Sequence, residues 1–293
     1  SPGDVILVPN PSYPIHQFGF IIAGASVRNV PVKPDEHYLK ALETAVIQSI
    51  PKPKALVLNY PNNPTAITTD LEFYCQIVDF CRRHGIYILS DLAYAELYFD
   101  GKPPPSILQV PGGREIAVEF TSMSKTYSMP GWRIGFATGN KYLIASLARI
   151  KSYLDYGAFT PIQVASTAAL NGSQDCVSEI RQLYRDRRDI LIESMRSAGW
   201  HIPSPTATMF AWAPLPPVFE NLGSVEFSKL LLNRSKVAVA PGIAFGENGD
   251  GHVRISLVEN RQRIRQAARN VKSLLSDSDC AIENLERRKA IIS

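Results

Sequence analysis

The chain has 293 residues, of which 45% are hydrophobic and 20% are charged, and its formal net charge is +4. This length is sufficient for one large domain and a second, smaller one. No stretch approaches the roughly 18–20 consecutive apolar residues that a membrane-spanning helix requires. The modest charge is compatible with small anionic ligands and gives no indication of a nucleic-acid partner.

The four cysteines, at positions 75, 81, 176 and 280, show no C-x-x-C spacing. We therefore expect reduced thiols, which suit a cytoplasmic protein. No basic and apolar leader of the kind found in signal peptides is visible. Because Ser1-Pro-Gly-Asp4 leads directly into a strand, we also expect that the N-terminal part of the first domain precedes residue 1.

The first two-thirds of the chain alternates between strand and helix patterns. Helices are predicted at residues 17–25, 38–50 and 70–84, the last with Asp70 as N-cap and Gly85 as C-cap. Strands rich in Val, Ile and Leu are predicted at residues 5–8, 27–32, 55–58, 86–89, 116–121 and 133–138. This alternation predicts an α/β fold with a mostly parallel sheet and helices on both faces.

The rest of the chain predicts helices and then a smaller domain. Residues 141–169 are helical with an interruption at 155–161, and a long helix spans 174–198, where the arginines are expected on the solvated side. Strands at 208–212, 237–240 and 253–257, with helices at 224–235 and 260–275, predict an α+β domain. We expect a large domain at 1–172, a small domain at 173–293, and a charged tail at 283–289 that frays.

Polar segments follow four of the predicted strands, at residues 10–13, 59–65, 91–94 and 122–125. In parallel sheets, ligands bind outside the carboxyl ends of the strands. In the last segment Lys125 offers an amine nucleophile, while Ser122, Ser124 and Arg133 offer a phosphate pocket. Lys125 can form a Schiff base with an aldehyde on the same phosphorylated molecule, and pyridoxal phosphate meets both demands. The alternative is an ordinary surface lysine in a polar turn.

The other strand ends contain residue types that this cofactor requires. Asp91 is placed to hold the pyridine nitrogen in its protonated form, because an opposite charge at close range favours the proton. Tyr94 and Asn63 are candidates for contact with the ring 3-oxygen, and Tyr13 for stacking on the ring. Each of these residues taken singly is as readily a cap or turn residue.

The motifs as a set resemble those of the class I/II (fold-type I) aminotransferases. They are Asn10-Pro-Ser-Tyr-Pro14, Tyr60-Pro-Asn-Asn-Pro-Thr65, Asp91-Leu-Ala-Tyr94, Ser122-Met-Ser-Lys125 and Gly131-Trp-Arg-Ile-Gly135. By this resemblance Lys125 forms the internal aldimine and shuttles the proton between Cα and C4′, with Asp91 and Tyr94 as further catalytic residues. The implied cofactor ligands are Tyr13, Asn63, Asp91, Tyr94, Ser122, Ser124, Lys125 and Arg133. Asn63 and Arg254, the latter in Gly251-His-Val-Arg254, are the implied substrate ligands, and no metal is implied.

Within this family the segment 151–165 is similar to bacterial glutamate–pyruvate (alanine) aminotransferases. The resemblance implies transamination between an L-amino acid and a 2-oxo acid, in a homodimer whose interface includes residues 153–159. An LL-diaminopimelate aminotransferase, a C–S lyase or a decarboxylase on the same fold are alternatives, as is a non-enzymatic sensor domain of a transcription regulator. Two departures stand out: the family's phosphate-binding glycine/serine loop and N-terminal arm are absent, and Ala66 stands where many relatives carry glycine.

Overall fold

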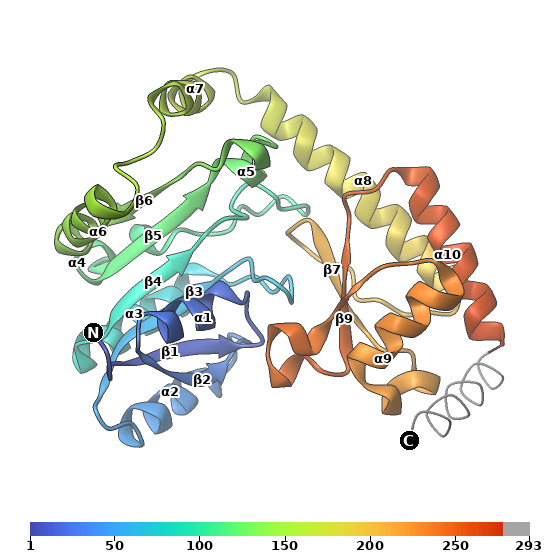
Figure 1. Cartoon of the computed structure of the whole chain (residues 1–293), viewed down its shortest axis with the longest axis horizontal. Coiled ribbons are helices and arrows are strands. Elements are labelled where there is room, and N and C mark those ends of the chain that lie inside the picture. Colours follow the sequence, from blue (N-terminus) through green and yellow to red (C-terminus); the bar gives the residue numbers. More distant parts are fainter. Residues whose placement is uncertain (278–293) are drawn as a thin grey trace. The chain divides into compact units, whose positions relative to one another are not determined.

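The computed structural model describes residues 1–277, which form two compact units (Figure 1). Unit 1 comprises Ser1–Leu183 with Thr206–Thr208, and unit 2 comprises Tyr184–Pro205 with the residues from Met209 onward. The predicted tail at 283–289 and Cys280 lie outside the described residues. The predicted domain division after residue 172 stays a prediction.

Unit 1 is built on a six-stranded sheet with strand order β2-β1-β3-β4-β5-β6 (Figure 1). Neighbouring strands from β2 to β5 run parallel, and β6 is antiparallel to β5. The strands are β1 (Val5–Asn10), β2 (Ser26–Pro31), β3 (Pro53–Asn59), β4 (Tyr87–Asp91), β5 (Ala117–Ser122) and β6 (Gly135–Gly139). The prediction of a mostly parallel α/β sheet is confirmed.

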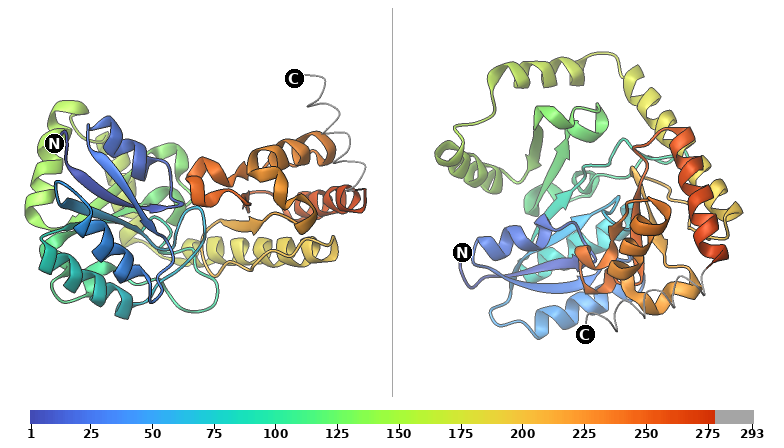
Figure 2. Two further views of the ribbon diagram at one scale, coloured as in Figure 1. Left: turned by 90° about the horizontal axis from the view of Figure 1, so that it is seen from below. Right: turned by 45° about the vertical axis from the view of Figure 1, so that its right-hand side comes forward.

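Successive strand residues point to opposite faces of this sheet, and each face has its own apolar core. Leu56 and Leu58 pack with α2 (Tyr38–Ile47) and α3 (Leu71–His84) on one face. Val57 and the neighbouring apolar residues of β1 pack with Phe20 of α1 (Ile15–Ile22) on the other. The helices therefore cover both faces of the sheet, as Figure 2 also shows. We call the face that is covered by α1 the α1 face.

The ends of α3 form as its sequence predicts. The Asp70 carboxylate accepts a hydrogen bond from Phe73 N at 2.9 Å, which satisfies one of the free amides of the first turn. Gly85 ends the helix in the left-handed conformation, at φ 67°. Both caps were expected, because the residue types suit these backbone positions.

Three further helices complete unit 1 and lead out of it. They are α6 (Lys141–Leu154), α7 (Thr160–Asn171) and α8 (Asp175–Ser197), and the break between α6 and α7 lies where it is predicted. Two short helices were missed, α4 (Gly113–Ile116) and α5 (Met123–Thr126). A single turn is too short to show a helical period in the sequence.

Two predicted strands are shorter than expected. Arg133 is not in β6, because it adopts a left-handed conformation at φ 51° after the 3-10 turn Pro130–Trp132. The predicted strand at 237–240 reduces to β8 (Ala240–Pro241), whose only described pairing is with β9 (His252–Ser256). Strand propensity depends on having a partner to pair with, which residues 237–239 do not have here.

Unit 2 is an α+β unit, as predicted. Its antiparallel sheet has the order β7-β9-β8, in which β7 is Phe210–Pro214. The sheet packs with the second half of α8, with α9 (Gly223–Leu230) and with α10 (Arg261–Ser276) around the buried rings of Trp200, Phe219 and Phe227. Among residues 1–277, no helix is both long and apolar enough to cross a lipid bilayer.

Candidate active site

Four strands of unit 1 end in polar residues at one edge of the sheet. β1 ends at Asn10, β3 at Asn59, β4 at Asp91 and β5 at Ser122, and we call these ends the carboxyl edge. In the register of the sheet Asn59 lies opposite Asp91, which in turn lies opposite Phe120, two residues before Ser122. Asn59 is two residues after Val57, so Asn59, Asp91 and Ser122 share the α1 face.

Asp91 makes the most specific contact at this edge. Its Oδ2 lies 2.9 Å from His16 Nε2, and its Oδ1 accepts a hydrogen bond from Ala93 N at 3.1 Å. His16 is buried in the first turn of α1, and its Nδ1 has no hydrogen-bond partner among the described residues. Imidazole and backbone N–H therefore hold the carboxylate in one orientation. His16 was not predicted; its sequence signal is its place three residues after Tyr13, one helical turn away.

Tyr13 lies beside this pair. Its ring is 44% exposed and meets the His16 ring edge-on, with 5.9 Å between centroids. His16 therefore contacts both Tyr13 and Asp91. An exposed aromatic face next to a carboxylate suits a planar, positively charged ring.

Asn63 is tied to the same place through Asn59, a second residue that the sequence did not single out. Asn59 is fully buried; its Oδ1 accepts from Asn63 N at 2.8 Å, and its Nδ2 donates to Asp91 O at 2.8 Å. One amide thus fixes the proline-rich turn against the end of β4. Tyr94 follows Asp91 in a loop, where its side chain is buried.

Lys125 lies on α5, immediately after β5. Ser122 caps this helix, since its Oγ accepts from Ser124 N at 3.2 Å. Burial lowers the pKa of Lys125, and the positive charge of Arg133 acts in the same direction, while the negative charge of Asp91 opposes both. The three charged groups are therefore close enough to interact. A lowered pKa leaves more of the amine neutral, which is the nucleophilic form.

The backbone around Arg133 brings the second half of this motif to the same edge. Gly135 lies opposite Ser122 in the β5–β6 ladder, and a Cβ atom there would be only 2.4 Å from Thr121 O. Glycine is therefore required for the close approach. Arg133 donates from Nη1 to Pro130 O at 3.0 Å and is exposed. Ser122, Ser124 and Arg133 thus form a group of hydroxyl and guanidinium donors near Lys125.

Arg254 belongs to unit 2. It lies on β9, the central strand of the sheet of that unit, opposite Trp212 of β7 and Ala240 of β8. Its guanidinium carbon is 4.6 Å from the centroid of the Phe245 ring and 5.0 Å from that of Phe210. Two aromatic rings at these distances limit the orientations of a planar guanidinium.

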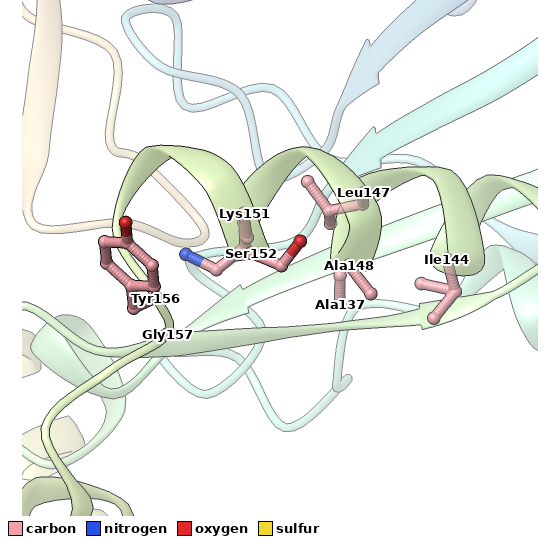
Figure 3. Close-up of a pocket in the computed structure, with 8 residues that line it drawn as sticks. All are labelled: Ala137, Ile144, Leu147, Ala148, Lys151, Ser152, Tyr156 and Gly157. Atoms are coloured by element: carbon pink, nitrogen blue, oxygen red, sulfur yellow. The ribbon is translucent and has the colours of Figure 1, made fainter.

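A hollow of about 360 Å³ lies between α6 and β6 (Figure 3). It is lined mainly by apolar side chains and contains none of the predicted site residues. Lys151 at its rim is paired with Asp155, with 2.5 Å between Nζ and Oδ2. An amine held by a carboxylate is a poor nucleophile, so the hollow is no rival to the segment that carries Lys125. Among residues 1–277, no three His, Cys, Asp or Glu side chains gather as metal ligands would.

Comparison with known proteins identifies the family. The profile "Aminotransferase class I and II" matches residues 1–271. AatC of Rhizobium meliloti (strain 1021), named as an aminotransferase, is 60% identical over 285 residues, covering 97% of this chain and 70% of AatC. The glutamate-pyruvate aminotransferase AlaC of Escherichia coli (strain K12) is 53% identical over 272 residues, covering 93% of this chain and 66% of AlaC.

The fold agrees with this assignment. A substrate-bound structure of BacF from Bacillus subtilis superposes with a TM-score of 0.88 at 35% identity, covering 94% of this chain and 69% of BacF. The chain thus spans about two thirds of the length of these relatives. With its sequence, fold and family profile in agreement, the chain belongs to the class I and II aminotransferases, a family of pyridoxal-phosphate-dependent enzymes.

Proposed function

We propose that this protein transfers an amino group between an L-amino acid and a 2-oxo acid, with alanine, glutamate, pyruvate and 2-oxoglutarate as its substrates. The observation that carries the proposal is the partly buried amine of Lys125, its pKa lowered by burial and by Arg133, at the same sheet edge as Asp91. The 53% identity to a glutamate-pyruvate aminotransferase supports the substrates. We further propose a cytoplasmic enzyme.

The donor set of unit 1 fits pyridoxal phosphate. Asp91 would face the ring nitrogen with Tyr13 against the ring, while Asn63 and Tyr94 would donate to the 3-oxygen. Ser122, Ser124 and Arg133 would bind the phosphate, for which a guanidinium fork is well suited. When bound, this cofactor supplies an aldehyde that reacts with amines and a ring that accepts electrons.

Lys125 has two tasks in this proposal. Its amine would hold the cofactor covalently, and as a free amine it would accept and return the proton at the substrate Cα. Both tasks need the neutral amine at some stage, which the lowered pKa favours. Asp91 keeps the ring nitrogen protonated, and the hydrogen bonds from His16 and Ala93 keep its carboxylate in place.

Arg254 is proposed to bind the α-carboxylate of the substrate. A guanidinium presents two parallel N–H donors to the two carboxylate oxygens, and the flanking rings of Phe210 and Phe245 hold its plane. Asn63 is proposed as a second substrate ligand.

Related chemistry is the alternative to this proposal. An LL-diaminopimelate aminotransferase, a C–S lyase or a decarboxylase would use the same cofactor-holding residues. A screen of amino acids, scored by the appearance of both the 2-oxo acid and pyridoxamine phosphate, separates them. Formation of both products from alanine or glutamate supports the proposal, whereas a lyase or decarboxylase leaves the cofactor in its aldehyde form.

Replacement of Lys125 by alanine is expected to abolish turnover while the fold is retained, because the amine that holds the cofactor and moves the proton is gone. Borohydride reduction followed by peptide mapping of the wild-type protein should locate the cofactor on Lys125. The exposed Lys141, at the start of α6, serves as control: Lys141→Ala should keep its activity. A label on Lys141 or Lys151 would overturn the assignment.

Asp91→Asn is expected to reduce the rate at least about a hundredfold. The change removes the charge that would pair with the protonated ring nitrogen of the bound cofactor; breaking a buried ion pair costs about 3–5 kcal/mol, and each ~1.4 kcal/mol corresponds to a factor of ten. Asp70→Asn is the matched control, since asparagine caps α3 equally well. The transamination rates of the two variants are compared by steady-state kinetics. An Asp91→Asn rate within about threefold of the wild-type rate contradicts this role.

Arg254→Lys should weaken the binding of amino acids and 2-oxo acids alike, because lysine keeps the charge and loses the fork. At about 1.5–3 kcal/mol for a hydrogen bond to a charged group, KM should rise roughly ten- to hundredfold. The dissociation constant of pyridoxal phosphate should hardly change, and Arg263→Lys on α10 should leave both values unchanged. Loss of cofactor without loss of substrate affinity would instead assign Arg254 to the phosphate.

We propose a homodimer whose interface includes residues 153–159, where Tyr153, Tyr156 and Phe159 are 77%, 91% and 70% exposed. Large exposed apolar side chains that gather in one segment are typical of a protein interface. Phe159→Ser should shift the protein toward monomer in sedimentation velocity runs, whereas Ile47→Ser, an equally exposed position on α2, should not. An active wild-type monomer at micromolar concentration would refute the dimer.

A further inference from the structure

The chain leaves the sheet after Asp91 and forms an irregular loop, residues 92–99, which we call the Tyr94 loop. Near its ends the loop is bonded to neighbouring segments: Leu92 N donates to Phe120 O at 2.8 Å, and Phe99 N donates to Thr206 O at 2.9 Å. Between these points, Leu97 N donates to Tyr94 O at 3.1 Å within the loop, and Leu97 O accepts from Thr208 N at 2.7 Å. The residues from the buried Tyr94 to Glu96 lie between these bonds, so contacts to this part of the loop affect the position of Tyr94.

One side chain of α8 contacts this middle part in three ways. Arg181 donates from Nε to Glu96 O at 2.9 Å and from Nη2 to Glu96 Oε2 at 2.7 Å. Its guanidinium carbon also lies 3.9 Å from the centroid of the Tyr98 ring. The backbone, a carboxylate and an aromatic face of the same loop thus share one cation, although Glu96 and Arg181 are 85 positions apart in the sequence.

This arrangement is more than a surface ion pair. The Arg181 side chain is only 21% exposed; its Nε and Nη2 both donate to Glu96, and its guanidinium lies over the Tyr98 ring. Exposed pairs contribute little because two mobile side chains must be ordered for one contact. Here the planar fork and the stacked ring fix the orientation of Arg181, so the bond to Glu96 O restrains the backbone itself.

The same end of α8 also contacts the segment that carries Lys125. Tyr127, two residues after Lys125, donates from its hydroxyl to Gln174 Oε1 at 2.8 Å, and Gln174 directly precedes α8. Residues at and just before the start of α8 therefore contact both the Tyr94 loop and the segment that follows β5.

We propose that Arg181 is a positioning residue of the active site: through Glu96 and Tyr98 it holds the Tyr94 loop, and so determines where the Tyr94 phenol lies. This inference rests on the proposed function, in which that phenol donates to the 3-oxygen of pyridoxal phosphate. Arg181 itself touches neither substrate nor cofactor in this proposal.

The first test is made on the cofactor-free protein by hydrogen exchange with mass spectrometry. Arg181→Gln and Glu96→Gln should both accelerate exchange of the amides of residues 94–98, since each removes the charged bond at the middle of the loop. Arg196→Gln, an exposed arginine in the last turn of the same helix, is the control and should leave this exchange at the wild-type rate. In Arg181→Lys the exchange rate of these amides should lie between the wild-type rate and that of Arg181→Gln, because lysine keeps the charge and loses the fork and the stacking.

The second test is made on the protein reconstituted with pyridoxal phosphate, by titrating the absorption band of the bound cofactor with pH. A hydrogen bond from Tyr94 to the 3-oxygen favours the deprotonated form. Weakening it in Arg181→Gln should raise the pH midpoint by about one unit, which is about a tenfold change in the ratio of the two forms. Arg181→Gln combined with Glu96→Gln should shift it no further, because both changes break one interaction.

Faster exchange together with a raised midpoint supports the proposal. Faster exchange with an unchanged midpoint makes Arg181 a structural residue only and overturns it, as does an Arg181→Gln protein that matches Arg196→Gln in both tests. A wild-type protein that takes up no pyridoxal phosphate refutes the proposed function instead, and the exchange measurement, which needs no cofactor, shows separately whether Arg181 holds the loop.

Discussion

The parallel register of β3, β4 and β5 is the constraint on which the candidate site depends. It places Asn59 opposite Asp91 and both on the α1 face, where His16 lies 2.9 Å from the carboxylate. A slip of one residue would turn Asp91 to the other face, away from His16. The same slip of β4 would carry Ile88 out of the core that it shares with α2 and α3. Apolar packing on one face therefore fixes the position of a polar group on the other.

Much of unit 1 could be predicted from the sequence. Runs of Val, Ile and Leu indicated buried parallel strands, and Asp70 with Gly85 set the ends of α3, because each signal is local. The failures were also local in origin. Arg133 was assigned to a strand because its neighbours favour one, but it follows the 3-10 turn Pro130–Trp132 in a left-handed conformation, at φ 51°. The one-turn helix that carries Lys125 is too short to show any period.

The candidate site divides in a similar way. Lys125, Asp91, Asn63 and Arg133 were selected because their residue types at strand ends suit one cofactor. His16 and Asn59 were not, because an ordinary helix or strand would accommodate each of them. The prediction that the arginines of the helix at 174–198 lie on its solvated side is wrong for Arg181, whose side chain is 21% exposed. The contacts of His16, Asn59 and Arg181 reach over 75, 32 and 85 positions, to Asp91 and Glu96. Only the folded chain brings these partners together, so the sequence does not show which residue each of them contacts.

In the proposed function, Lys125 and Asp91 have opposite roles at one sheet edge. The amine is to be available in its neutral form, and burial with the nearby charge of Arg133 lowers its pKa against the opposing charge of Asp91. The carboxylate is to face the cofactor ring nitrogen, and it receives hydrogen bonds from Ala93 N and His16. The difference is structural: Asp91 ends a central strand, whereas Lys125 lies on a single turn held by Ser122 and by the close β5–β6 contact at Gly135. Because burial is the main cause of the lowered pKa of Lys125, a change that exposes this amine to water would raise its pKa and leave less of it in the nucleophilic form.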